Sequence, residues 1–165
     1  MRKDTVFSAG IAMLLAGCQS TPSEVVSLAP RIAAPPPYSV REQECLALAM
    51  YWEARGEGEA GMVAVGWTIM NRVANPSFPS TACAVVYEGG ETPPCQFSWY
   101  CDGRSDRPRD WSSWQSAMRV AARLLTGPPS DPTSGALFFH STAVRSAWHR
   151  DRFRTARVGG HVFYR

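Results

Sequence analysis

The chain of 165 residues has the length of a single domain, and hydrophobic residues make up 45% of it, enough for a packed core. Its formal net charge is +3, and all but one of its 17 basic residues are arginine, most of them after position 100. Because these arginines are scattered and form no dense basic run, the sequence argues against an arm that binds nucleic acid.

The first seventeen residues read as a signal peptide. Arg2 and Lys3 form a short basic start, and the apolar run at 6–15 is too short to span a bilayer by itself. The run ends in Leu15-Ala16-Gly17-Cys18, which resembles the lipobox of bacterial lipoproteins. The resemblance implies cleavage before Cys18 and acylation of that residue, which anchors a protein firmly. An ordinary secretory signal with an incidental cysteine is the alternative.

Residue 19 is Gln rather than Asp, which in Gram-negative lipoproteins implies sorting to the outer membrane. The following stretch is rich in Ser, Ala and Pro and includes Pro35-Pro36-Pro37, a composition typical of an extended linker. Fully stretched, about 22 residues at ~3.3 Å each reach roughly 70 Å. We therefore expect a signal peptide at 1–17, an acylated cysteine and linker at 18–40, and one globular domain at 41–165.

Hydrophobic periodicity and helix-ending residues predict a mostly helical domain. We expect helices at about 41–55, 59–73, 81–86 and 111–125. The segment 95–101 reads as extended, and strands are expected at 136–140 and 161–164. The expected fold is therefore α+β, mostly helical, with a small sheet late in the chain.

A carboxyl group lies on the apolar face of the first expected helix. Four positions with i, i+3, i+4, i+7 spacing share that face: Leu46, Ala49, Met50 and Glu53. Burial raises the pKa of a carboxyl group, and a raised pKa suits a general acid near neutral pH. Gly56 can end the helix and leave Glu53 at the rim of a cleft. The alternative is that Glu53 only snorkels to solvent, or pairs with Arg55 or Arg72.

Four cysteines remain besides Cys18: Cys45, Cys83, Cys95 and Cys101. An exported chain favours two disulfides, for which three pairings exist. We favour Cys95–Cys101, which closes a short loop, together with Cys45–Cys83. A zinc site using these thiols with His140 or His161 is the alternative, but no CxxC or HExxH spacing supports it. No phosphate loop or nucleophile motif occurs, and we expect neither a metal nor a cofactor.

Several pieces of the chain, in one order, resemble the catalytic domain of the SleB-type cell-wall hydrolases, known from spore cortex-lytic enzymes. These pieces are Glu53-Ala-Arg-Gly-Glu57, Asn71-Arg72-Val73, Gln96-Phe97-Ser98, Asp131-Pro132-Thr133 and Gly160-His161-Val162-Phe163-Tyr164. The resemblance covers 43–165 and implies a single domain like that of lysozyme and lytic transglycosylases, with a small antiparallel sheet. It also implies that Glu53 is the catalytic acid.

The activity implied by the resemblance is cleavage of peptidoglycan glycan strands between N-acetylmuramic acid and N-acetylglucosamine by lytic transglycosylation. One carboxyl group suffices, because it first acts as acid and then as base for the muramic acid 6-hydroxyl, which leaves a 1,6-anhydro sugar. Glycosidases that use water or form a glycosyl-enzyme need two carboxyl groups. A water-using muramidase and a non-catalytic lipoprotein that binds peptidoglycan stay open as alternatives.

Four further residues are candidates for substrate binding: Glu57, Gln96, Ser98 and Thr133. Glu57 is either a second carboxylate of the site or a structural group at the helix end that bonds backbone N–H groups or Arg72. Gln96 and Ser98 either hydrogen-bond the acetamido groups of sugars or belong to an edge strand without a ligand. Thr133 either caps its turn or touches substrate. We expect a monomeric outer-membrane lipoprotein that faces the periplasm, is held at the membrane by its lipid, and does not bind nucleic acid.

Overall fold

The computed structural model describes residues 38–144 and 151–165. The expected signal peptide, Cys18 and nearly all of the expected linker lie outside the described residues. The described residues form four α-helices and two short 3-10 turns: α1 (Val40–Ala54), η1 (Arg55–Glu57), α2 (Gly58–Val73), α3 (Ala82–Val86), η2 (Ser98–Cys101) and α4 (Trp111–Thr126). No helix among them is long and apolar enough to cross a membrane.

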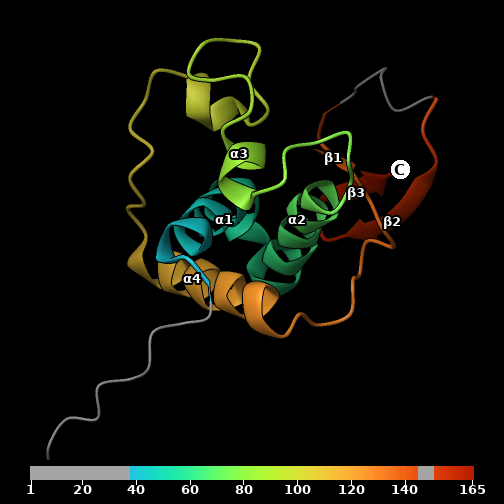
Figure 1. Ribbon diagram of the computed structural model, residues 1–165, viewed down its shortest axis with the longest axis horizontal. Helices are drawn as coiled ribbons and strands as arrows, with labels where there is room; N and C mark the ends of the chain where they lie inside the picture. Colours follow the sequence, from blue (N-terminus) through green and yellow to red (C-terminus); the bar gives the residue numbers. More distant parts are fainter. Residues whose placement is uncertain (1–37, 145–150) are drawn as a thin grey trace, which may run out of the picture. The chain divides into compact units, whose positions relative to one another are not determined.

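Three short strands follow the helices: β1 (Phe138–Ser141), β2 (Arg154–Val158) and β3 (His161–Tyr164). They form an antiparallel sheet in the order β1-β3-β2, with Phe139 opposite Phe163 and an irregularity between Arg154 and Ala156. Figure 1 shows the sheet beside α2, with α4 running below α1 and α2. The expected α+β fold, mostly helical with a small antiparallel sheet, is confirmed.

The expected helices are all present, with ends that differ by at most one residue. The extended reading of 95–101 is wrong, because this segment turns into η2 and the amide of Tyr100 donates to the carbonyl of Phe97 at 3.0 Å. The disulfide between Cys95 and Cys101 closes this short loop and favours a turn over a strand. Strand β2 was not expected from the sequence, because its composition is largely polar and it follows no apolar run.

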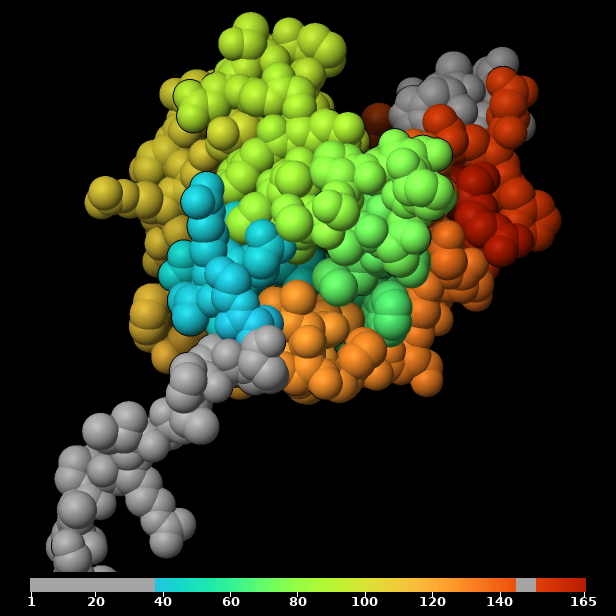
Figure 2. Space-filling view, in the orientation of Figure 1, coloured from blue at the N-terminus to red at the C-terminus, as the bar shows by residue number. Residues whose placement is uncertain are grey.

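The core lies where α1 packs against α2 and α4. Leu46, Met50 and Tyr51 of α1 are completely buried, as is Ile69 of α2. The helices approach closely at Gly66, where an added Cβ would collide with Leu124 Cδ1 and lie 2.8 Å from Met50 Sδ. In Figure 2, residues that follow α2 cover the centre of the visible face, with α4 below them and the sheet to one side. This packing holds α1 rigidly between its neighbours.

Two adjacent side chains of α2 fasten the helices to the segment that leads into the sheet. Asn71 Nδ2 donates to Asp131 Oδ2 at 3.0 Å and to the carbonyl of Ala136 at 3.1 Å. Arg72 Nε donates to the carbonyl of Leu137 at 2.7 Å. Since β1 begins one residue after Leu137, α2 sets the position of the first strand.

The structure forms both disulfides that the sequence analysis favours. Cys45–Cys83 joins α1 to α3 across 38 residues of sequence, and Cys95–Cys101 closes a loop with a separation of 6. The first bond staples the N-terminal half of the core. The second shapes a surface segment.

Loss of the long-range disulfide should destabilise the chain more than loss of the short one. The chain-entropy model predicts costs of about 4 kcal/mol for Cys45→Ser/Cys83→Ser and about 2 kcal/mol for Cys95→Ser/Cys101→Ser, because the first bond closes the longer loop. Urea unfolding of the two variants measures both costs. Thiol titration of the unfolded, unreduced protein should find none of these four thiols free, whereas free thiols or one equivalent of zinc would contradict the assignment.

Candidate active site

Glu53 lies in the last turn of α1 and lines a cavity of about 230 Å³. Four parts of the chain supply the walls: α1, α2, the segment around the start of η2, and β1. The lining residues are Glu53, Arg72, Cys95, Gln96, Phe97, Ser98 and Phe139. The structure therefore brings together three of the predicted site residues, Glu53, Gln96 and Ser98.

Burial alone raises the pKa of Glu53 from 4.5 to about 7. Within 38–144 and 151–165, no hydrogen bond or ion pair reaches its carboxyl group. The alternative pairings with Arg55 and Arg72 are absent, because Arg55 Nη1 donates to Tyr51 Oη at 2.9 Å and Arg72 Nε donates to the carbonyl of Leu137. Glu53 therefore keeps its proton to a higher pH than an ordinary carboxyl group, and the protonated form is the state a general acid requires.

Arg72 supports the part of the cavity wall that contains Gln96. Its side chain is buried, with only 2% of its surface exposed, and its guanidinium lies 6.0 Å from the centre of the Phe97 ring. Gln96 Oε1 accepts hydrogen bonds from Arg72 Nη1 at 2.9 Å and Nη2 at 3.3 Å. Burial lowers the pKa of Arg72 to about 10, so the group stays charged at neutral pH. From the sequence, Arg72 is expected only as a partner for a carboxylate.

Gln96 and Ser98 line the same cavity as Glu53, because side chains alternate between inward and outward directions on either side of buried Phe97. Phe97 points into the core with 3% of its surface exposed, so its two neighbours face outward. The backbone N–H of Gln96 donates to the carbonyl of Glu88 at 2.9 Å, which fixes the backbone of this wall. Both polar side chains therefore face the cavity from a segment held by a backbone bond, by Arg72 and by a disulfide.

Phe139 is a lining residue that sequence reasoning placed only within an expected strand. It comes from β1 and packs edge-on against His161, with ring centroids 5.5 Å apart. Alternation along β1 was the available signal, but it does not show which helix the strand faces. His161 is itself buried, and burial lowers its pKa.

Glu57 has a structural place in this fold. Its Oε2 accepts a hydrogen bond from the amide of Gly160 at 2.7 Å, which ties η1 to the turn between β2 and β3. An added Cβ at Gly160 would lie 2.6 Å from Glu57 Oε1, so a larger residue there would require the Glu57 carboxylate to shift. Glu57 does not line the cavity of Glu53. This arrangement corresponds to the alternative in which Glu57 bonds a backbone N–H group.

The shortest hydrogen bonds of Thr133 lie within its own turn, which corresponds to the alternative in which Thr133 caps that turn. Its side chain is completely buried, and its hydroxyl donates to Asp131 Oδ1 at 2.6 Å while its amide donates to the same oxygen at 2.7 Å. Hydrogen bonds within the turn and from Asn71 lower the pKa of Asp131 despite its partial burial. Thr133 therefore caps its turn, at a place that does not line the cavity.

No group of three or more His, Cys, Asp and Glu side chains in the described part of the chain is arranged to hold a metal ion. His140 contacts the carbonyl of Ser141 at 2.8 Å and Tyr164 Oη at 3.0 Å through its two ring nitrogens. The four cysteines are engaged in disulfides. The polar chemistry of the cavity therefore rests on one carboxyl group, one amide, one hydroxyl and one guanidinium.

The raised pKa of Glu53 predicts a cost in stability that depends on pH. Its pKa is 4.5 in the unfolded chain and about 7 in the folded one. Between these values the folded state holds more protons, so the free energy of unfolding falls as pH rises and levels off above about 7. Glu53→Gln does not titrate. It should therefore be more stable than the native chain at about pH 8, by roughly 2–3 kcal/mol, with a much smaller difference at about pH 4.

Urea unfolding at the two pH values measures this difference. Glu59→Gln is the matched control, because the Glu59 carboxylate is exposed and pairs with Arg123 at 2.6 Å. The control should show no gain in stability at the higher pH. A gain for Glu53→Gln that is equal at both pH values would show that the substitution acts through packing and not through titration.

The chain matches the model of a protein family described as Cell Wall Hydrolase over residues 56–164. It is 34% identical over 130 residues to the spore cortex-lytic enzyme of Halalkalibacterium halodurans, a match that covers 78% of this chain and 36% of the relative. It is 32% identical over 127 residues to the spore cortex-lytic enzyme of Bacillus cereus, covering 76% of this chain and 45% of the relative. The chain thus spans less than half the length of these two relatives.

A shorter relative, the cell wall hydrolase CwlJ of Oceanobacillus iheyensis, is 32% identical over 131 residues, which cover 74% of this chain and 85% of the relative. Among solved structures, the catalytic domain of Bacillus cereus SleB aligns with a TM-score of 0.60 and 30% identity, over 80% of this chain and 95% of that domain. The catalytic domain of the germination-specific lytic transglycosylase SleB from Bacillus anthracis aligns with a TM-score of 0.59 and 28% identity, over 80% and 100%.

The family model covers Gly56 and Glu57, Arg72, the wall residues Gln96 and Ser98, and the whole sheet, and it begins three residues after Glu53. The solved catalytic domains are covered almost completely by this chain, so the agreement extends to the fold. The chain therefore belongs to the Cell Wall Hydrolase family of enzymes.

Proposed function

We propose that this chain is a lytic transglycosylase that cleaves peptidoglycan between N-acetylmuramic acid and N-acetylglucosamine, with Glu53 as the acid and then the base. The observation that carries the proposal is a single buried carboxyl group, with a pKa of about 7, on the wall of a cavity. No other carboxyl group of the described residues lines that cavity. A relative in the solved structures is a lytic transglycosylase, which supports the same reaction.

The proton returns to Glu53 within one cycle. The protonated carboxyl donates its proton to the glycosidic oxygen as the bond to the anomeric carbon breaks. The resulting carboxylate then accepts the proton of the muramic acid 6-hydroxyl, whose oxygen attacks the anomeric carbon and closes the 1,6-anhydro ring. No water is consumed, and one carboxyl group serves both steps.

Gln96 and Ser98 are suited to hold the acetamido groups of the sugars. Because Arg72 binds the amide oxygen of Gln96, the amino group of Gln96 remains to donate to a substrate carbonyl. The Ser98 side chain is exposed and can donate or accept. Arg72 acts through Gln96 in this scheme and is a positioning residue.

Two alternatives are less well supported. A water-using muramidase needs a second carboxyl group across the scissile bond, whereas Glu57, the nearest candidate in sequence, is bonded to the turn between β2 and β3. A protein that only binds glycan strands has no need of a carboxyl group whose ionisation is suppressed by burial, since that burial costs stability.

Digestion of purified sacculi by the native chain and by Glu53→Gln tests the proposal. The variant should lose at least about 100-fold in cleavage rate, the scale expected for a general acid, while keeping its fold by circular dichroism. The native products should end in 1,6-anhydro sugars, which are one water lighter than hydrolysed products by mass spectrometry. The native rate should also decline as pH rises through about 7, because Glu53 loses its proton.

Glu57→Gln serves as the comparison, since it alters a structural contact and should reduce activity less than Glu53→Gln. Near-native turnover by folded Glu53→Gln would remove Glu53 from the mechanism. Products that carry an added water would instead establish the muramidase reaction.

We also propose that the domain at 41–165 works from the outer membrane, on its periplasmic side. This proposal rests on the lipobox-like Leu15-Ala16-Gly17-Cys18, on Gln19, and on the Pro-rich composition of the linker at 18–40. An acylated Cys18 anchors the chain, and the linker lets a monomeric domain reach glycan strands some distance away.

Cys18→Ser tests the anchor, because it removes the thiol that acylation requires. The variant should lose lipid and should no longer fractionate with the outer membrane. A chain that begins at Arg41 should remain folded and should cut isolated sacculi as the native chain does. Lipid and outer-membrane fractionation retained by Cys18→Ser would disprove the anchor, and a folded but inactive shortened chain would disprove the domain boundary.

A further inference from the structure

A second cavity, of about 340 Å³, borders the candidate active site. Trp52 and Trp99 line it, and Trp99 packs against Phe97 of the first cavity, with ring centroids 6.2 Å apart. In sequence, the two tryptophans are next to Glu53 and Ser98, which line the first cavity. Figure 1 shows the segment after η2 passing along α1 before it reaches α4, and this segment supplies the outer wall. A substrate that occupies the first cavity therefore has a neighbouring pocket within reach.

The base of this pocket is built from indole rings that other bonds hold in place. The rings of Trp52 and Trp99 are stacked, with centroids 6.5 Å apart and an interplanar angle of 23°. Trp52 Nε1 donates to the carbonyl of Asp106 at 3.2 Å. The indole N–H of Trp99 is buried and has no hydrogen-bond partner among the described residues. The base is thus rigid and retains an unused donor.

The outer wall, formed by the segment between η2 and α4, is fixed to the last turns of α1 through Tyr51. Tyr51 Oη accepts hydrogen bonds from the amides of Arg109 and Asp110, at 3.0 Å and 3.1 Å. It also accepts from Arg55 Nη1, whose guanidinium lies 5.1 Å from the centres of the Tyr51 and Trp52 rings. The pocket is therefore formed before any ligand binds.

Three arginines line the pocket: Arg55, Arg104 and Arg109. None of them forms an ion pair in the described part of the chain, where Arg123–Glu59 is the one ion pair. The carboxylates of Asp102 and Asp106 also line it, and burial together with the charges of Asp102 and Glu91 raises the pKa of Asp106. Arg55 is engaged by Tyr51, whereas the side chains of Arg104 and Arg109 remain available to an external anion.

Guanidinium groups bind carboxylates through paired, planar hydrogen bonds. The N-acetylated sugars of a glycan strand are uncharged, whereas the peptides attached to muramic acid end in free carboxylates. The pocket has the charge and the apolar base that such a peptide requires, and it borders the site where the strand would be cut.

We propose that this second cavity binds the carboxylate-bearing stem peptide of peptidoglycan. The inference rests on the proposed function, since it names the part of the substrate that the neighbouring pocket recognises. The lactyl carboxylate of muramic acid has the same chemistry but is free only after the peptide has been removed. The two sources of carboxylate can therefore be separated experimentally.

Binding is measured with the full chain carrying Glu53→Gln, so that no cleavage occurs. The probe is the soluble stem peptide released from sacculi by an amidase, titrated by tryptophan fluorescence. Adding Arg104→Gln/Arg109→Gln should weaken binding about tenfold or more, the scale of losing hydrogen bonds to a charged group. A peptide whose carboxylates are converted to amides should show a comparable loss on the protein with an intact pocket.

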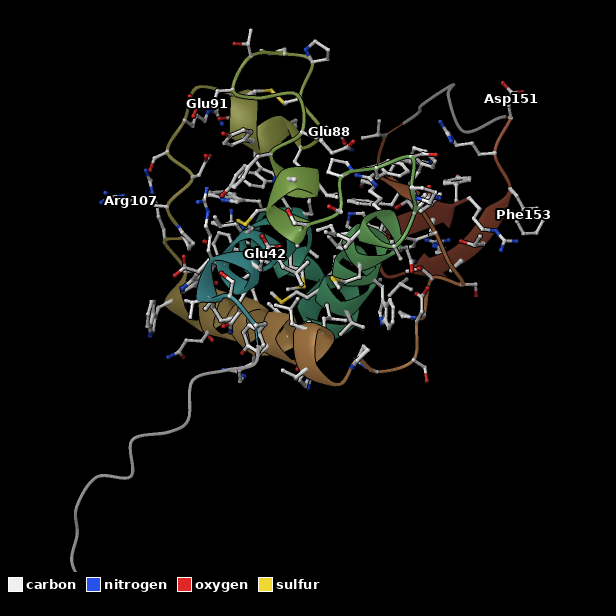
Figure 3. The ribbon with its side chains drawn as sticks, viewed as in Figure 1. Glu42, Glu88, Glu91, Arg107, Asp151 and Phe153 are labelled. Carbon is white, nitrogen blue, oxygen red and sulfur yellow. A yellow bond between two sulfur atoms is a disulfide. The ribbon has the colours of Figure 1, made fainter. Side chains whose placement is uncertain are left out.

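Arg107→Gln/Arg119→Gln is the matched control, because it removes the same number of charges outside this pocket. Figure 3 shows Arg107 on the same segment, pointing away from the helices. This control should bind the peptide as the parent chain does. Equal binding by Arg104→Gln/Arg109→Gln, or equal binding of the amidated peptide, would overturn the proposal.

Cleavage kinetics separate this inference from the proposed function. With the native carboxyl group at position 53, Arg104→Gln/Arg109→Gln should lower kcat/KM about tenfold on strands that carry peptides and leave it unchanged on strands stripped by the amidase. An equal loss on stripped strands would assign the pocket to the lactyl carboxylate and overturn the peptide assignment. A native chain that binds peptide but cuts neither strand would refute the proposed function and leave the pocket supported.

Discussion

The structure depends on shielding one carboxyl group from most of the surrounding water without giving it a partner. Glu53 is the point where the buried face of α1 reaches a cavity, and burial alone raises its pKa to about 7. A partner would restore the ordinary acidity of the group, so the neighbouring cations must be engaged elsewhere. Arg55 is engaged by Tyr51, and Arg72 by the carbonyl of Leu137 and by Gln96. The chemistry of the site therefore depends on the partners of Arg55 and Arg72 as much as on Glu53 itself.

Two successive residues of α2, Asn71 and Arg72, make most of the contacts that hold the cavity and the sheet in place. Asn71 fastens the turn that holds Asp131 and Thr133, and Arg72 fastens both the start of the sheet and the cavity wall at Gln96. Glu57, just before α2, closes the arrangement at the far end of the sheet through Gly160. The sheet is small, but it is attached to α2 at one end and to η1 at the other, and Phe139 of β1 lines the cavity.

Helical periodicity predicted the helices and placed Glu53 on a buried face, because both depend on spacing within one segment. Glu57 bonds a group distant in sequence, Gly160, and the turn that Thr133 caps is held by Asn71, also distant in sequence, so residue types alone left two readings for each. The segment 95–101 has the alternation of a strand, yet a disulfide across six positions bends it into a turn. Strand β2 escapes prediction because its polar residues gain order only by pairing with β3.

Cys95 is both a lining residue of the Glu53 cavity and one half of a disulfide. The same wall carries Gln96 and Ser98, so its shape depends on the oxidation state of two sulfur atoms as well as on the packing of the core. Assembly of the site is therefore coupled to oxidative folding. Reduction of Cys95–Cys101 would remove one of the restraints on this wall, and the bonds to Arg72 and Glu88 would remain.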